Sequence, residues 1–331
     1  MFKQAVLPQV TWLKLPEKVK QAGWLNVLGK ISLPLIGLCI FLMIWGGVAQ
    51  NIDTSLGKFP GPTDVWQQAG NLISEHNAER ERASAFYERQ EKRNQARLEA
   101  DPSYQPKIRP YTGSPTFFDQ IWTSLYTVFV GFVVASVVAI PLGILCGLSQ
   151  PVYTAVNPLI QLFKPVSPLA WLPLVTMIVS AVYVSENPIF AKSFLTSAFT
   201  VALCCLWPTL INTAVGVSSI PSDLVNVSRV LRLNALTHVI KIVLPSSFPM
   251  IFTGLRLSLG IGWMVLIAAE MLAQNPGLGK FVWDEFQNGS SESLARIMVA
   301  VLVIGMIGFA LDRLMLLLQR KISWDKSVVL R

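Results

Sequence analysis

The sequence predicts an all-α integral membrane protein with six transmembrane helices, and three observations support this fold class. Hydrophobic residues make up 52% of the 331 residues and charged residues only 14%, whereas soluble domains carry about 25% charged residues. The apolar residues gather in six blocks, each long enough for the roughly 20 residues that cross a bilayer core. Both ends and one loop carry an excess of lysine and arginine over acidic residues, as the positive-inside rule describes for cytoplasmic segments.

The six apolar blocks are the expected membrane spans: 31–50, 118–148, 158–183, 193–215, 246–273 and 294–318. The first begins too late for a signal peptide and no small-residue cleavage site follows it, so we expect a retained span. The second and third contain prolines, among them Pro141, Pro165 and Pro168. Because neighbouring helices can satisfy the backbone groups that proline frees, we expect kinked or broken helices that line a cavity.

The distribution of charge predicts that both termini are cytoplasmic, which requires an even number of spans. Residues 1–30 are rich in lysine and are expected to form a cytoplasmic amphipathic tail at the membrane interface. Residues 319–331 are expected to form a second cytoplasmic tail. The core of five helices, 118–318, then carries its basic loop 221–245 in the cytoplasm. We assign the net charge of +8 to this topology and not to nucleic-acid binding.

Residues 51–117 are expected to be a periplasmic insertion. Between positions 75 and 99 they are dense in charges of both signs and contain few large apolar residues, so they cannot bury a core of their own. A solvated helix or hairpin is the expected form. It would serve as a spacer, which the composition favours, or as a docking surface for an external partner.

The sequence offers no enzymatic chemistry. It lacks a phosphate-binding loop, and Gly277–Lys280 does not have the required spacing. The spans hold no catalytic triad, carboxylate pair or metal-binding cluster, so we expect a non-catalytic chain that binds no cofactor or metal. Two alternatives remain. A thiol oxidant would use Cys204 and Cys205, although neighbouring residues on a helix point apart. An ion-coupled secondary transporter needs a carboxylate relay, and the spans are nearly free of carboxylates.

The segment 221–245 joins two apolar blocks yet is basic. Ser222 is expected to cap a short helix that places Leu224, Val227 and Leu231 on one face. A second short helix is expected over 235–243, ended by Leu244-Pro245. Such a hairpin, lying parallel to the membrane, can insert its first helix into a groove on a partner. An ordinary basic loop is the alternative.

This segment resembles the coupling motif of ABC importer permeases, which reads Glu-Ala-Ala, then Gly, then Ile-x-Leu-Pro. Asn226-Val227-Ser228 stands at Glu-Ala-Ala and Arg232 at Gly, while Ile242, Leu244 and Pro245 match. Stretches within 123–143, 164–174 and 254–279 also resemble the permease core. The combination is similar to permeases for nitrate, bicarbonate, taurine and alkanesulfonates, and 229–233 and 281–285 look most like nitrate permeases, in which this degenerate motif is expected.

The resemblance implies a type I ABC importer permease fold in the bacterial inner membrane. The expected partners are a second copy of the chain, two cytoplasmic ATPase subunits that use ATP and Mg, and a periplasmic or lipid-anchored substrate-binding protein. Nitrate or nitrite is the expected substrate, with bicarbonate or a sulfonate such as taurine as the alternative. The residues implied to couple to the ATPases are Asp223, Leu224, Asn226, Val227, Ser228, Arg229, Leu231, Arg232, Leu244 and Pro245.

Charged side chains within spans are costly and often functional. The candidates for the translocation path are Lys164, Ser167, Trp171, Thr176, Arg256 and Glu270. A structural role is favoured for Arg256. An acidic group is unsuited to binding an anion, so Glu270 is expected in a gate or in a bond between helix and loop. For Ser167, Trp171 and Thr176, helix packing is the alternative to a place on the path.

Overall fold

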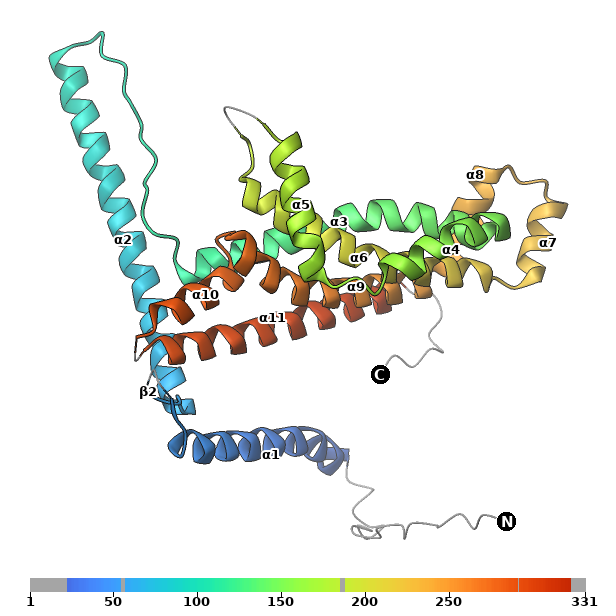
Figure 1. The fold of residues 1–331 in the computed structure, drawn as a ribbon, viewed down its shortest axis with the longest axis horizontal. Coiled ribbons are helices and arrows are strands. Elements are labelled where there is room, and N and C mark those ends of the chain that lie inside the picture. Colours follow the sequence, from blue (N-terminus) through green and yellow to red (C-terminus); the bar gives the residue numbers. More distant parts are fainter. Residues whose placement is uncertain (1–22, 55–56, 185–187, 291, 323–331) are drawn as a thin grey trace. The chain divides into compact units, whose positions relative to one another are not determined.

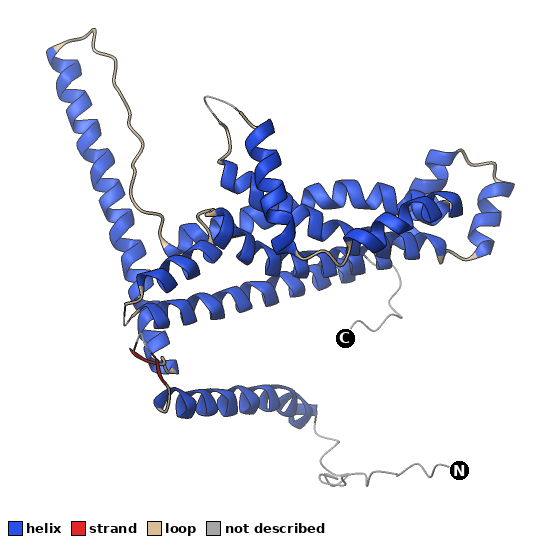
Figure 2. Ribbon diagram, in the orientation of Figure 1, coloured by secondary structure: helices blue, strands red, loops and turns tan. Residues whose placement is uncertain are grey.

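The computed structural model describes residues 23–54, 57–184, 188–290 and 292–322, and these are almost entirely helical (Figure 2). The predicted N-terminal tail therefore lies largely outside the described residues, as does most of the C-terminal tail. The chain divides into two compact units, Met1–Asp64 and Val65–Arg331. Long-range packing within the second unit positions the candidate sites.

The first unit contains one apolar helix and a short ladder. Helix α1 (Gly23–Gln50) includes a 19-residue stretch, Ser32–Gln50, that is apolar enough to cross a membrane and matches the first predicted span. Strands β1 (Asp53–Thr54) and β2 (Gly57–Lys58) pair antiparallel. The indole nitrogen of Trp45 donates a hydrogen bond to the carbonyl of Pro60 at 3.1 Å, which ties the end of α1 to the segment beyond the ladder.

The remaining elements are helices (Figure 1). In chain order they are α2 (Pro62–Ala100), α3 (Phe117–Leu148), α4 (Gln150–Phe163), α5 (Pro168–Val182), α6 (Lys192–Ser218), α7 (Ser222–Val230), α8 (Ala235–His238), the π-helical turn η2 (Val239–Val243), α9 (Leu244–Ala273), α10 (Leu278–Asn288) and α11 (Ser293–Ile322). The described residues contain five helices able to cross a membrane, or six if α4 and α5 count as one bent span. Helix α6 lies at the centre and packs against α3 and α9.

The third predicted span, 158–183, is broken into two helices, as its prolines led us to expect. Helices α4 and α5 are separated by residues 164–167 and bend by 102°. Proline lacks an amide donor and disfavours helical geometry in the residue before it, so Pro165 and Pro168 break the helix here. The other predicted spans coincide with helices whose ends differ by a few residues.

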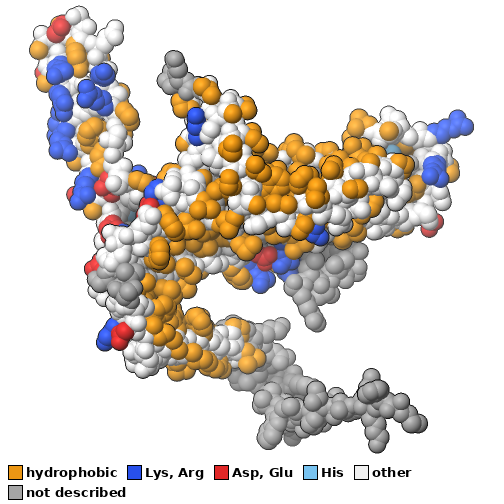
Figure 3. All heavy atoms as spheres, in the orientation of Figure 1, with side chains coloured by type: hydrophobic (Ala, Val, Ile, Leu, Met, Phe, Trp, Pro, Cys, Tyr) orange, Lys and Arg blue, Asp and Glu red, His pale blue; other side chains and the backbone are white. Residues whose placement is uncertain are grey.

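Small residues let α3 and α6 approach closely. A Cβ atom on Gly131 would lie 2.6 Å from the carbonyl oxygen of Ala198, and one on Gly147 would lie 2.7 Å from that of Ala214. In a bilayer, where lipid is as apolar as leucine, such close backbone packing is a main source of association between helices. The outer flanks of the helices are covered with hydrophobic side chains (Figure 3), as expected for surfaces that meet lipid or another apolar chain.

The insertion is a long helix, α2, followed by an extended segment that returns along it. Gln90 holds the return segment through its side-chain amide, which accepts a bond from the backbone nitrogen of Arg109 at 2.9 Å. The hydroxyl of Tyr111 donates to Glu79 at 2.8 Å, and this bond raises the pKa of Tyr111. The expected hairpin is thus held by side chains and not by a sheet.

The base of α2 is fastened to the core by an ionic cluster. The guanidinium of Arg296, on α11, makes two contacts of 2.9 Å with Glu75 on α2. Its Nε atom lies 2.7 Å from Glu285 on α10, whose other oxygen accepts a bond from Ser293 at 2.9 Å. One arginine therefore joins three helices.

Arg296→Ala should loosen α2 and lower the free energy of unfolding by about 2 kcal/mol, because Glu285 is only 12% exposed and would lose its cation. Thermal unfolding and limited proteolysis of α2 measure this. The control is Arg82→Ala, which removes a 74% exposed side chain from a 3.4 Å pair and should change stability by less than about 0.5 kcal/mol. Equal effects of the two substitutions would contradict the assignment.

Candidate functional site

Residues 221–245, here called the basic hairpin, fold into α7 and α8 joined by a tight turn. The hydroxyl of Ser228 lies 2.7 Å from Nδ1 of His238, which links the two helices. The side chain of Asn234 accepts a bond from the backbone nitrogen of Thr237 at 2.7 Å and so caps α8. Lysine and arginine side chains are visible at this end of the unit (Figure 3). The hairpin is therefore a defined structure within the chain.

Two local expectations for the hairpin are wrong. Pro221 is the cap position of α7, and Ser222 is its first helical residue. Leu244-Pro245 does not end a helix, because α8, η2 and α9 run on continuously from Ala235 to Ala273. In η2 the backbone nitrogen of Leu244 bonds to the carbonyl of Val239, five residues back. Pro245 follows in the first turn of α9 and has no amide hydrogen to donate to the turn before it.

The predicted coupling residues lie in two places, on α7 with the turn that follows it and at the start of α9. Leu224, Val227 and Leu231 on α7 and its cap are 41%, 51% and 63% exposed, so their apolar face is uncovered in the single chain. Exposed polar neighbours on the same short segment are Asp223, Asn226, Arg229 and Arg232, whereas Ser228 is buried inside the hairpin. Leu244 and Pro245 lie apart from this face, at the start of α9. A role in coupling stays a prediction for all of them.

Arg232 adopts a left-handed backbone conformation, with φ of 49°. The turn closes α7 through a bond of 3.1 Å from the backbone nitrogen of Leu233 to the carbonyl of Ser228. Glycine is the usual residue at such a helix end because it has no Cβ to strain. The resembled motif has Gly at the position of Arg232, and the left-handed backbone of this turn explains why the motif prefers Gly there.

Arg232→Gly should therefore raise the free energy of unfolding slightly, by about 0.5 kcal/mol. Relief of left-handed strain contributes about 1–2 kcal/mol, and the extra backbone entropy of glycine offsets part of it. Arg229→Gly is the matched control. Its position is helical, so it should destabilise by about 1 kcal/mol. Thermal unfolding of the two variants should show shifts of opposite sign, and shifts of the same sign would contradict this account.

A second candidate site is a cavity of about 350 Å³ where α4 breaks from α5 and faces α6 and α9. Three predicted path residues line it: Lys164, Ser167 and Trp171. Ser167 caps α5, accepting a bond from the backbone nitrogen of Leu169 at 3.4 Å, and thus marks the positive end of that helix. Among the residues that line the cavity, Lys164 carries the one charge. The arrangement suits a small anion.

The other three path candidates do not line this cavity. Thr176 donates a bond to the carbonyl of Leu172 within its own helix at 2.8 Å. Arg256 pairs through two bonds with Asp312 on α11, at 2.5 and 3.1 Å. Glu270 is fully buried and accepts a bond from the backbone nitrogen of Gly279 at 3.0 Å. A place on the translocation path stays a prediction for these residues, and their observed contacts hold the core together.

The sequence predicted a gate or a bond between helix and loop for Glu270, but it did not predict the contact of Glu270 with α3. The hydroxyl of Ser124, on α3, lies 2.8 Å from each carboxylate oxygen and also accepts a bond from the backbone nitrogen of Leu278. Nearby, Asn275 donates to Thr127 at 3.2 Å. The segment between the fifth and sixth predicted spans contains a helix, α10, which these contacts dock against α3 and α9. A serine within an apolar span, far from Glu270 in sequence, carries no signal of this contact.

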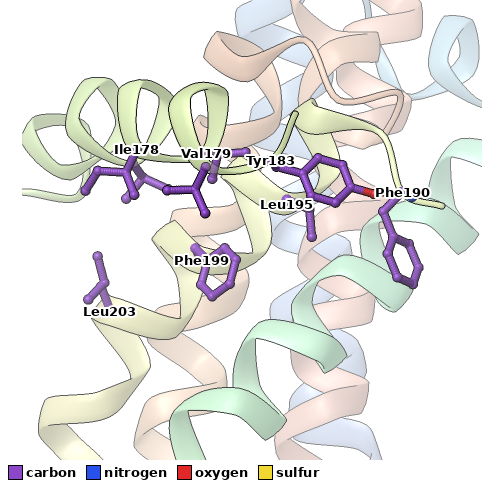
Figure 4. A pocket seen from close by; sticks show the side chains of 9 residues that line it. Ile178, Val179, Tyr183, Phe190, Leu195, Phe199 and Leu203 are labelled. Atoms are coloured by element: carbon purple, nitrogen blue, oxygen red, sulfur yellow. Dashed lines mark hydrogen bonds between the residues drawn. The ribbon is translucent and has the colours of Figure 1, made fainter. Parts of the chain in front are cut away.

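A larger cavity of about 510 Å³ lies between α5 and α6 and is lined by apolar side chains (Figure 4). Ile178, Val179 and Phe199 face it, and the hydroxyl of Tyr183 accepts a bond from the backbone nitrogen of Phe190 at 3.1 Å. No charged side chain lines this cavity, so it suits an anion poorly. Over the part of the chain that the structure describes, no cluster of three metal-ligating side chains occurs.

Comparison with known proteins places this geometry in context. Residues 139–324 match the family model "Binding-protein-dependent transport system inner membrane component". The chain is 37% identical to the nitrate import permease protein NrtB of Leptolyngbya laminosa over 66% of this chain and 74% of that protein. It is 33% identical to the bicarbonate transport system permease protein CmpB of Synechococcus elongatus over 90% and 91% of the two chains.

The fold is also similar to a solved structure, an inward-facing form of the MetNI methionine ABC transporter. The TM-score is 0.53, and the match covers 62% of this chain and 95% of that one. Sequence identity is 15%, so this likeness concerns the fold alone.

Proposed function

This chain belongs to the family of binding-protein-dependent transport system inner membrane components, and from that premise we propose that it is the nitrate permease subunit of an ATP-driven importer. A permease of this family is a multi-pass inner membrane protein and is not an enzyme. Its partners include ATPase subunits and a binding protein. Nitrate as the substrate, a second copy as the other half of the path and cytoplasmic termini are parts of the proposal.

The cavity beside Lys164 is the observation that carries the choice of a small anion. Its lining is largely apolar, with one cation and few polar groups, as is typical of small-ligand sites. Nitrate is weakly hydrated, so entry into such a cavity costs it less than it costs a strongly hydrated anion. Bicarbonate is the second candidate because the chain is about as similar to bicarbonate permeases as to nitrate permeases.

In the proposed mechanism the ATPase subunits act on the membrane domain through the basic hairpin. ATPase subunits would hold the exposed face of α7 and move it when they close on ATP. Helices α6 and α9, which flank the hairpin in the chain, would then shift between inward-open and outward-open arrangements. Such coupling requires that the ATPases contact the two states differently.

An ion-coupled secondary transporter is less well supported. A proton or sodium relay needs carboxylates that are free to change partners. Glu270 on α9 and Asp312 on α11 already have partners in Ser124 and Arg256.

Uptake by the complete transporter, reconstituted in liposomes with its operon's binding protein, tests the proposal. We expect ATP-dependent uptake of ¹⁵N-nitrate, with ¹⁴C-bicarbonate taken up at least about tenfold more slowly. Preferential uptake of bicarbonate would reject nitrate as the substrate. Uptake of either anion without the ATPase subunits would reject the importer mechanism.

A further inference from the structure

The second half of α2 carries a row of arginines on one face. Arg89, Arg93 and Arg97 follow one another at four-residue spacing, so their side chains lie on the same side of the helix. All three are exposed, and Lys and Arg side chains gather visibly on this helix (Figure 3). These three residues are here called the arginine stripe.

The arginine stripe has no counter-charge in the described part of the chain. None of its three guanidinium groups lies within 4.0 Å of a carboxylate there. Glu88 and Glu99 belong to another face, because their distance from Arg93 along the chain rotates them by about 120–140° around the helix axis. Like charges four residues apart weaken a helix, so local helix stability does not account for the stripe.

The stripe stands on a hairpin that its own contacts hold in place. The hydroxyl of Tyr87 accepts a bond from the backbone nitrogen of Tyr111 at 3.0 Å. The guanidinium of Arg97 lies over the ring of Tyr104, 5.5 Å from its centroid. The ion pairs of Arg296 tie the base of α2 to the core. The charges are therefore presented on a fixed surface, which lowers the cost of ordering side chains when a partner binds.

The surroundings of the stripe favour an acidic protein over an anionic membrane as its partner. A helix that lies on a membrane has an apolar face beside its basic residues. The buried residues of α2 are all in its first half, and its second half carries carboxylates away from the stripe, at Glu81, Glu88 and Glu99. Such a hydrated surface suits a soluble partner of opposite charge, because complementary potentials steer the encounter and fix the orientation.

We propose that the arginine stripe is a docking surface for an acidic patch on the binding protein of this importer. The family depends on such a protein, and in the proposed topology residues 51–117 lie on the outer side, where the binding protein meets the permease. A contact through exposed charges forms rapidly and stays weak, as a partner that delivers anions repeatedly requires. The proposal rests on the external position of residues 51–117 and is independent of whether the anion is nitrate.

The test is the affinity of the operon's binding protein for the complete permease–ATPase complex in nanodiscs. Arg93→Glu reverses the central charge of the stripe and keeps the helix, since the new carboxylate is four residues from Arg89 and Arg97. We expect Kd to rise about fivefold at about 50 mM salt, mainly through slower association, because a repulsion replaces an exposed attraction. At about 0.5 M salt the difference should fall below about twofold.

Lys92→Glu is the matched control. It makes the same change of charge one residue away, on a side chain rotated by about 100° from Arg93 toward Glu88. Its Kd should stay within about twofold of the wild type. Equal increases in the two variants, or no increase in Arg93→Glu, would overturn the proposal. An effect of Arg93→Glu that occurs only in nanodiscs with anionic lipid would assign the stripe to the membrane and overturn it as well.

The external position of the insertion is tested separately. Ala100→Cys, at the end of α2, should react with a membrane-impermeant maleimide in intact spheroplasts. The wild-type chain is the control, because all four of its cysteines lie in predicted spans. Absence of labelling would reject the topology and the proposal with it. Labelling combined with an unaltered Kd of Arg93→Glu would reject the docking surface alone and leave the proposed function intact.

Discussion

Val227→Asp should separate this permease from its ATPase subunits and leave its membrane core folded. Val227 is 51% exposed on the apolar face of α7, so the new carboxylate is solvated in the free chain and should cost little there. In the complex the same carboxylate would lose water against an apolar groove. Burying an unpaired charge costs several kcal/mol, which corresponds to a loss of at least about a hundredfold in affinity. Co-purification of the ATPase subunits and ATP-dependent uptake measure the result.

The control for this substitution is Leu236→Asp, on α8. Leu236 is also an exposed apolar residue of the basic hairpin, at 69%, but it lies outside the face that Leu224 and Val227 share. We expect it to retain the ATPase subunits within about threefold of the wild type. Normal assembly of the Val227→Asp complex would show that α7 is not the contact, and equal losses in both variants would assign the effect to the charge of the hairpin as a whole.

Gly279→Ala should disrupt the junction between α9 and α10. A Cβ atom at this position would lie 2.1 Å from the carbonyl oxygen of Ile267 and 2.9 Å from Cβ of Glu270. The backbone would have to move away, and its nitrogen would release the carboxylate of Glu270. Overpacking and an unpaired buried group together should lower the free energy of unfolding by at least about 3 kcal/mol. Thermal unfolding in detergent measures this.

Gly260→Ala is the matched control, because Gly260 also lies in a helix, α9, but has no atom within 4 Å of an added Cβ. Alanine is a better helix former than glycine by about 1 kcal/mol, so this variant should be as stable as the wild type or slightly more so. A Gly279→Ala protein with wild-type stability would show that the α9–α10 junction tolerates displacement.

The all-helical membrane fold could be predicted from the sequence for a simple reason. A bilayer demands runs of about 20 apolar residues whose backbone is satisfied internally, and this demand is visible in composition and block length alone. The membership predicted from the coupling motif is confirmed. The sequence could also place prolines in the third span and so anticipate a break, because proline acts locally on its own backbone.

Contacts between distant segments were decided only by the tertiary structure. The bond between Ser124 and Glu270 joins residues 146 positions apart, and nothing in either neighbourhood of the sequence marks it. In the sequence Trp207 is one more apolar residue of a span, and only the structure shows that it lines one cavity with Lys164. The physical reason is that hydropathy and helix periodicity record what each residue does relative to its own helix. Which polar atoms find partners depends on how the helices pack.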